Sequence, residues 1–279
     1  IIFDIAPKSG YRIFMDGYPG VIASDDDFGV NSAGLMVTET TISQFNGWDP
    51  NGKPEFMRAR KAMQYASSID DYVRIMLDGN NGGYANDWLL GDRKTGEIAQ
   101  FELGLKNYGL WRTMNGYFVG SNFATHPKVL AEETKFDAKD PSNSPNARRA
   151  RWVELMEQNK GRIDVPLAEK FLADHYDSFD KKEQPNERTL CGHVELSPRG
   201  AAIWERPPYS PDGAVQGKAM DSGLAKTMTF RARYGHPCGS DFLSARFLKD
   251  HPEFAWQAPH LRDMKAGPWT TFTAGARPR

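Results

Sequence analysis

The chain has 279 residues, of which 39% are hydrophobic, enough for a sizeable core and incompatible with a disordered chain. Its 35 basic and 36 acidic residues give a formal net charge of -1, so no broad electrostatic field draws it to nucleic acid or an anionic membrane. No apolar run approaches the roughly 20 residues that cross a bilayer. We therefore expect no membrane span, no nucleic-acid partner and a small-molecule or peptide-like substrate.

The N-terminal half predicts short antiparallel strands around a helical insertion. The first strands, separated by turns rich in Gly, Pro and Asp, are expected at 1–5, 11–15, 21–23 and 35–41. Helices are expected over 55–66 and 70–77, because apolar residues recur there at helical spacing; in the first these are Phe56, Ala59, Met63 and Ala66. A second block of strands, linked by hairpin turns, is expected at 87–91, 97–103, 107–113 and 117–120. Two strand blocks with helices favour two packed sheets covered by helices.

The C-terminal half predicts fewer regular elements. Helices are expected over 147–158, 167–175 and 241–249, and strands over 191–196 and 201–205. From about residue 207 the chain is rich in Pro and Gly, and we expect this tail to wrap the core. Since no repeat, low-complexity tract or convincing linker divides the chain, residues 1–279 are interpreted as one domain.

The segment Asn80–Asp92 is the most informative part of the sequence. Amide side chains crowd a glycine turn just before an apolar strand that contains Trp88. Asn86 is the first polar side chain after that turn, so a rigid strand can aim its carboxamide at a developing oxyanion. The open alternative is an ordinary hairpin loop, because Asn and Gly tolerate tight turns cheaply.

Polar residues at two other places are candidates for a substrate site. Alternation along the strand 35–41 puts Glu39 and Thr41 on one face, which can line a pocket; the alternative is that Thr serves as a common strand residue. Arg148 and Arg149 open a helix and can contact a substrate carboxylate in a bidentate way, with surface salt bridges as the alternative.

The remaining polar groups give no metal site. Three consecutive acids, Asp25, Asp26 and Asp27, are interpreted as a solvated turn rather than a cation site. Cys191 and Cys238 are compatible with one disulfide or two buried thiols, and neither has the paired spacing of a zinc site. Cys191 and His193 alternate on a predicted strand, which allows a thiol and imidazole pair, although a buried thiol is the simpler interpretation.

Several segments occur in an order that points to one family. They are Gly29–Leu35 running into Thr38–Thr41, Glu55–Gln64, Asn80–Trp88, Gly120–Asn122, Pro145–Arg149 and Arg188–His193. In this order they resemble the phospholipase B-like proteins and the related penicillin acyltransferase family, which are N-terminal nucleophile hydrolases. The similarity spans most of the chain and is looser in the tail.

This resemblance implies an α+β fold, a four-layer αββα sandwich with two antiparallel sheets between helix layers. It also implies autocatalytic cleavage that frees an N-terminal Cys, whose α-amine, with a pKa of about 7.7 to 8.0, serves as the base. The chain starts at Ile1, so we expect this Cys on a preceding segment or a companion chain. The family's secreted, periplasmic or lysosomal location is implied as well, and no cofactor is expected.

The site implied by the resemblance has two groups of residues. Asn86 stabilises the oxyanion, and Thr40 or Thr41 positions the nucleophile's amine or the substrate. The substrate-binding candidates are Glu39, Tyr84, Asn122, Arg148 and Arg149.

We expect a cysteine-type amidohydrolase or acyltransferase acting on a linear amide or ester. Penicillin-like amides, peptides, N-acyl amino acids and phospholipid esters all fit this description. One alternative is a non-catalytic binding protein that retains the sandwich and its pocket. Another is a conventional hydrolase that uses Cys191 and His193.

Overall fold

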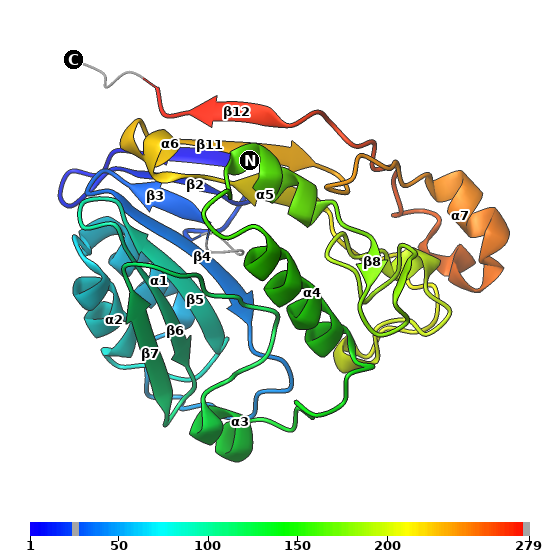
Figure 1. The fold of residues 1–279 in the computed structure, drawn as a ribbon, viewed down its shortest axis with the longest axis horizontal. Helices are drawn as coiled ribbons and strands as arrows, with labels where there is room; N and C mark the ends of the chain where they lie inside the picture. The colour runs from blue at the N-terminus through cyan, green and yellow to red at the C-terminus, as the bar shows by residue number, and fades with distance from the viewer. Residues whose placement is uncertain (24–27, 276–279) are drawn as a thin grey trace. The chain divides into compact units, whose positions relative to one another are not determined.

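The computed structural model describes residues 1–23 and 28–275 (Figure 1). The chain groups into two compact units. Unit 1 comprises Ile1–Lys139, Met220–Phe230 and Phe272–Arg279, and unit 2 comprises Asp140–Ala219 and Arg231–Thr271. That the whole chain acts as one domain, with its tail wrapped around the core, stays a prediction.

Unit 1 is built on a seven-stranded antiparallel sheet in which every strand lies beside its neighbour in the sequence. Its strands are β1 (Ile2–Ile5), β2 (Ile13–Asp16), β3 (Gly29–Asn31), β4 (Leu35–Thr41), β5 (Asn86–Asp92), β6 (Glu97–Leu103) and β7 (Tyr108–Thr113). The pairing of β4 with β5 joins the two strand blocks, which the sequence had assigned to separate sheets. That assignment was wrong, because the helical insertion between the blocks returns the chain to the same sheet edge.

Helices α1 (Glu55–Tyr65) and α2 (Ile69–Leu77) cover one face of this sheet (Figure 1). Alternation along β4 and β5 directs Leu35, Val37, Trp88 and Leu90 into the core beneath them. Helix α1 starts at the predicted residue and α2 starts one residue before the predicted one. Ser68 caps α2, because its side chain accepts a hydrogen bond from the backbone N–H of Asp71. This apolar layer fixes the register of the strands that carry the site.

The opposite face of the sheet carries aromatic and buried polar side chains. The ring of Phe230 lies 4.9 Å from that of Phe14 and 5.3 Å from that of Phe28. Further along the sheet, the buried carboxylate of Glu102 accepts hydrogen bonds from the backbone N–H groups of Thr125 and His126. This anchors the loop that leads into α3 (Pro127–Glu133).

Unit 2 has short elements joined by long loops. Its helices are α4 (Ser144–Gln158), α5 (Val165–Leu172) and α7 (Ser244–Asp250), with the 3-10 turns η1 (Val194–Leu196), η2 (Ala202–Trp204) and η3 (Pro252–Gln257). Tyr176–Asp177 and Lys182–Glu183 form the hairpin β8–β9. A three-stranded sheet has the order β10 (Gln216–Ala219), β11 (Thr229–Tyr234) and β12 (Thr270–Thr273). Residues 229–230 and 272–273 of this sheet, and the short helix α6 (Ser222–Lys226), are grouped with unit 1.

The predicted fold class, α+β with antiparallel sheets and helices packed on them, is confirmed. The second sheet, however, comes from the segment that had been interpreted as an irregular tail. The strands predicted at 21–23, 117–120, 191–196 and 201–205 are wrong. At 191–196 and 201–205 the backbone closes local hydrogen bonds instead, such as Ser197 N–H to Val194 C=O and Glu205 N–H to Ala202 C=O.

Across residues 1–23 and 28–275, no helix has both the length and the apolar character needed to cross a bilayer.

Candidate functional site

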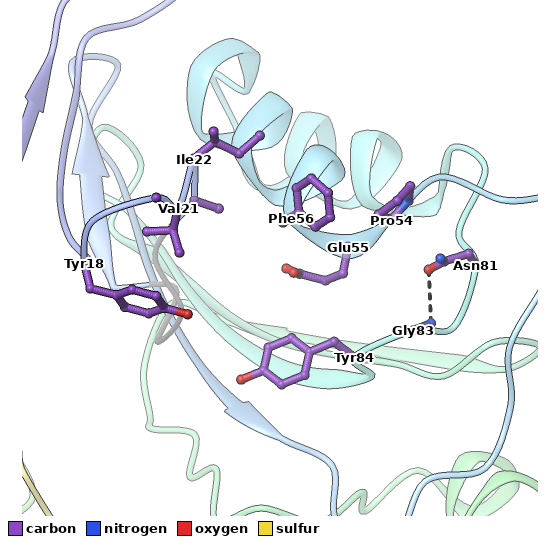
Figure 2. A pocket seen from close by; sticks show the side chains of 11 residues that line it. Tyr18, Val21, Ile22, Pro54, Glu55, Phe56, Asn81, Gly83 and Tyr84 are labelled. Carbon is purple, nitrogen blue, oxygen red and sulfur yellow. Dashed lines mark hydrogen bonds between the residues drawn. The ribbon is translucent and has the colours of Figure 1, made fainter. Parts of the chain in front are cut away.

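A cavity of about 520 Å³ opens in unit 1 beside the N-terminus of α1. It is lined by Tyr18, Gly20, Val21, Ile22, Ala23, Pro54, Glu55, Phe56, Asn81, Gly83 and Tyr84. Figure 2 shows Glu55 and the ring of Tyr84 directed into the space that Tyr18 borders from the other side. Most of the lining is apolar, with one buried carboxylate, so the cavity suits a ligand that is largely hydrocarbon.

The glycine turn before β5 shapes one wall of this cavity. Asn80 and Asn81 each accept, through Oδ1, a hydrogen bond from the backbone N–H two residues ahead, at 3.0 Å. Gly82 has φ +72°, and a Cβ there would meet Leu105 at 2.7 Å, so glycine is required. Tyr84 follows with φ 61°, an uncommon conformation for a bulky residue. The turn thus places the Tyr84 ring in the cavity.

Behind Tyr84, four of the predicted site residues form one hydrogen-bonded network. Thr41 donates from Oγ1 to the Tyr84 hydroxyl at 2.9 Å, and that hydroxyl donates to Glu39 Oε1 at 3.3 Å. With its carboxamide turned so that nitrogen faces acceptors, Asn86 donates to Glu39 Oε2 at 3.1 Å. The predicted common face of Glu39 and Thr41 is confirmed, because Thr41 pairs with Asn86 and Glu39 with Trp88 in the sheet.

Asn86 itself is fully buried. Both N–H groups of its carboxamide are used, one by Glu39 and the other by the carbonyl of Ala85 at 2.9 Å. An oxyanion at this position has to replace one of those acceptors. The oxyanion role of Asn86 stays a prediction. It requires that the oxyanion take the place of Glu39 or of the Ala85 carbonyl as the acceptor of one N–H.

Thr40 and Asn122 lie together on the other face of the sheet. The backbone N–H of Asn122 donates to Thr40 Oγ1 at 2.7 Å, and its side chain donates to the carbonyl of Thr41 at 3.2 Å. Asn122 also has a positive φ of 68°. Gly120 precedes it with no room for a side chain, since a Cβ would meet Thr40 Cγ2 at 2.3 Å. The loop is therefore fastened to the end of β4.

Arg148 and Arg149 belong to α4 in unit 2. Arg148 donates from Nε to Ser144 Oγ at 3.1 Å, and burial lowers the pKa of its guanidinium to about 10. Both arginines are half-buried. The predicted contact of either arginine with a substrate carboxylate stays a prediction.

Of the predicted residues, only Tyr84 lines the cavity directly. The sequence missed Tyr18, Ile22, Glu55 and Asn81, and it misread Phe56, which belongs to the cavity mouth and is 49% exposed rather than buried with Ala59 and Met63. One sequence signal could have indicated the cavity. Tyr18, between Gly17 and Gly20, and Ile22, just after them, are large apolar side chains in a loop, where such residues often mark a binding surface. The acidic run Asp25–Asp27 lies outside the described residues.

The predicted pair of Cys191 and His193 forms in unit 2, on a turn rather than a strand. The Cys191 sulfur lies 3.4 Å from His193 Nε2, and Glu195 Oε1 lies 2.7 Å from His193 Nδ1. Cys238, also a free thiol, lies 3.6 Å from the same Nε2.

The charges in this group are strongly coupled. The hydrogen bond between the two thiols, together with burial, raises the pKa of Cys191, while the same bond holds the pKa of Cys238 well below its usual range. Burial alone would lower the pKa of His193, but its hydrogen bonds to Cys238 and Glu195 outweigh burial and raise that pKa to about 9. A fully buried thiol with a raised pKa is a poor nucleophile, which disfavours Cys191 as the catalytic group of a conventional hydrolase.

Comparison with known proteins identifies the class. The sequence profile of the family described as Phospholipase B matches residues 3–165, more than half of the chain. The chain therefore belongs to the phospholipase B family, and the resemblance expected from its sequence is confirmed.

Two relatives from Caenorhabditis elegans match along most of the chain. The protein named Putative phospholipase B-like 1 is 26% identical over 282 residues, which cover 88% of this chain and 47% of the relative. The protein named Putative phospholipase B-like 3 is 25% identical over 306 residues, which cover 94% and 49%. The chain thus spans about half the length of these relatives. Among solved structures, a variant of the conjugated bile acid hydrolase of Clostridium perfringens is similar with a TM-score of 0.45 and 12% identity, covering 80% of this chain and 74% of that chain.

Proposed function

We propose that this chain is the substrate-holding part of an acyl hydrolase or acyltransferase that cleaves a linear ester or amide. Membership of the phospholipase B family supports action on an acyl bond. The observation that carries the proposal is the largely apolar cavity of about 520 Å³, with the Glu39, Thr41, Tyr84 and Asn86 network directly behind its wall.

In this proposal the cavity holds the hydrocarbon part of the substrate. Tyr18, Ile22 and Phe56 offer half-exposed apolar surface at its mouth. Each methylene moved from water into such surroundings contributes about 0.8 kcal/mol, or roughly a three- to fourfold gain in binding. Long-chain acyl groups are therefore preferred over short ones until the cavity is full.

The nucleophile of the proposed reaction lies outside residues 1–279. The chain has two cysteines, and both lie beside the His193 ring in unit 2. We propose an N-terminal Cys on a preceding segment or a companion chain, with its own α-amine as base. Thr40 or Thr41 then positions that amine or the substrate.

Two carboxamides are candidates for stabilising the oxyanion. Asn86 can stabilise the oxyanion if the substrate takes the place of Glu39 as the acceptor of the Asn86 side-chain N–H. Asn81 lines the cavity, and within the described residues its Nδ2 donates no hydrogen bond, so this donor is available without displacement. Because a lost oxyanion donor typically costs about 10²- to 10³-fold in kcat, substitution of each by alanine shows which one acts.

The test compares two neighbouring residues of α1 in the natural protein, including any chain that precedes Ile1. Phe56 lines the cavity and is 49% exposed, whereas Met57 is 52% exposed and is not part of the lining. We expect Phe56→Asp to lower kcat/KM at least tenfold for long-chain acyl esters and amides, with little effect on short-chain ones. The matched control, Met57→Asp, should leave both unchanged.

Release of fatty acid measured by mass spectrometry provides the readout, and iodoacetamide labelling identifies the thiol. The proposal is abandoned if folded, unlabelled protein turns over no acyl ester or amide, although a separate sample shows that its N-terminal Cys reacts with iodoacetamide. Saturable binding of acyl compounds without turnover, lost in Phe56→Asp, would instead establish the non-catalytic binding protein.

A further inference from the structure

Four potential metal ligands from three separate segments of unit 2 meet at one point. The Cys/His cluster consists of His175, Cys191, His193 and Cys238. His175 lies between α5 and β8, the next two lie on the turn before η1, and Cys238 follows β11. One ligand atom from each side chain lies within 4.8 Å of all the others.

The measured separations match those around a tetrahedral ion. His193 Nε2 lies 3.2 Å from His175 Nε2, 3.4 Å from the Cys191 sulfur and 3.6 Å from the Cys238 sulfur. Zinc bonds of about 2.3 Å to sulfur and about 2.0 to 2.1 Å to nitrogen place tetrahedral ligand atoms about 3.3 to 3.8 Å apart. We propose that the Cys/His cluster is a structural zinc site.

Hydrogen bonding alone does not account for this arrangement. A neutral imidazole has one N–H and one lone pair, and Glu195 occupies Nδ1 of His193 at 2.7 Å. That leaves a single lone pair or proton at Nε2 facing three neighbours, two of them thiols. One cation at the centre satisfies all four atoms together, and two thiolates with two imidazoles form a donor set typical of zinc.

The surroundings of the cluster are those expected around a metal. The Glu195 carboxylate fixes the His193 ring with Nε2 toward the sulfurs, the usual arrangement for a ligating histidine. The backbone N–H of Ser240 donates to the Cys238 sulfur at 3.4 Å, which suits a thiolate. Gly239, with φ +95°, forms the turn that brings Cys238 inward.

A second group of candidate ligands, His193, Glu195 and His236, is the weaker choice. Glu195 Oε1 lies 3.3 Å from His236 Nε2, but the same oxygen is already bound to His193 Nδ1. This group has no soft ligand. A cavity of about 230 Å³ borders these three residues, and of the Cys/His cluster it is lined by His193.

Four protein ligands leave no open coordination position, so the ion acts in stability rather than catalysis. It ties together the end of α5, the turn before η1 and the loop after β11, closing long stretches of chain. The sequence indicated no zinc site, because neither cysteine has a paired spacing. Only Cys191 and His193 are close in sequence, and the other two ligands, His175 and Cys238, come from distant segments.

The test measures zinc in the full chain purified without chelators. We expect about one zinc per chain, and expect Co²⁺ to replace it with the intense absorption of thiolate-to-cobalt charge transfer. Cys191→Ser and Cys238→Ser should each lose the ion, whereas the control His260→Asn, an exposed histidine outside the cluster, keeps it. Glu195→Gln should retain the ligands but bind about 10- to 100-fold more weakly.

If the cysteine variants fail to fold, the wild-type protein still tests the inference. Removal of the metal by a chelator should expose two reactive thiols and speed amide hydrogen exchange near the Cys/His cluster, and added zinc should reverse both. The inference is overturned if folded protein with reduced thiols binds neither Zn²⁺ nor Co²⁺, or if Cys191 and Cys238 are joined in a disulfide.

Discussion

Unit 1 and unit 2 are stabilised by different kinds of buried contact. The core of unit 1 is a continuous apolar cluster between its sheet and helices α1 and α2, with Trp88 and Phe101 at its centre. Unit 1 also buries polar groups, such as Asn86 and Glu102, but these lie on or beside its sheet. In unit 2 the buried polar and charged groups, including Asp177, Arg188 and His193, hold turns. Where strands and helices are short, side chains make the hydrogen bonds to backbone N–H and C=O groups that regular secondary structure would otherwise provide.

The largest loss of stability is expected when a large side chain is removed from the core of unit 1. Trp88 is fully buried, and Trp88→Ala should lower the free energy of unfolding by about 3 to 5 kcal/mol, because the transfer energy and the packing around the hole are lost together. Urea unfolding measures the change. Trp48→Ala, at an exposed site of the same unit, is the control and should change stability little.

In unit 2 the comparable change removes one partner of a buried ion pair. Arg188 donates to Asp177 from Nε at 2.9 Å and to Asp180 from Nη2 at 2.6 Å. Arg188→Met should cost about 3 kcal/mol or more, since Asp177 is left buried without its cation. The exposed Arg206→Met should cost less than about 1 kcal/mol.

Hydrogen exchange sharpens this comparison between the units. Faster exchange should appear in 174–195 for Arg188→Met and in β5 and β6 for Trp88→Ala. Equal spreading of both effects over both units would show that they unfold together and that the contrast has no energetic meaning.

The smallest effect concerns a surface carboxylate of unit 1. Hydrogen bonds from Arg74 and Ser67 lower the pKa of Asp71 from 3.8 to about 2. Because the folded pKa is the lower one, this contribution to stability is complete above about pH 4 and is lost as the pH falls toward 2. Asp71→Asn should flatten the pH dependence of the urea midpoint in that window, and Arg74→Gln should shift the pKa of Asp71 back toward 3.8. An unchanged profile in both variants would contradict this origin.

Much of unit 1 could be predicted from sequence alone. Strand β6 was predicted at its observed bounds, and α1, α2 and β5 to within about a residue, since each carries a clear period of two or 3.6. Asn86, Thr41, Glu39 and Tyr84 were all singled out, and the structure joins them in one network. That grouping followed from alternation on β4 and from the turn before β5.

Unit 2 was predicted less well for a physical reason. Val194 and Leu196 alternate as they would in a strand, yet the backbone there closes onto itself and the buried polar partners decide the path. Strands β10 to β12 carry little alternation, and no sequence pattern indicated their pairing.

The sequence by itself determined the longer strands and helices of unit 1, the family and most of the polar residues behind the cavity wall. Only the tertiary structure decided that Tyr18, Glu55 and Asn81 border one cavity and that His175 meets Cys238. Local periodicity records which face of an element is buried. Contacts between segments far apart in the chain depend on packing and register, which no short stretch of sequence encodes.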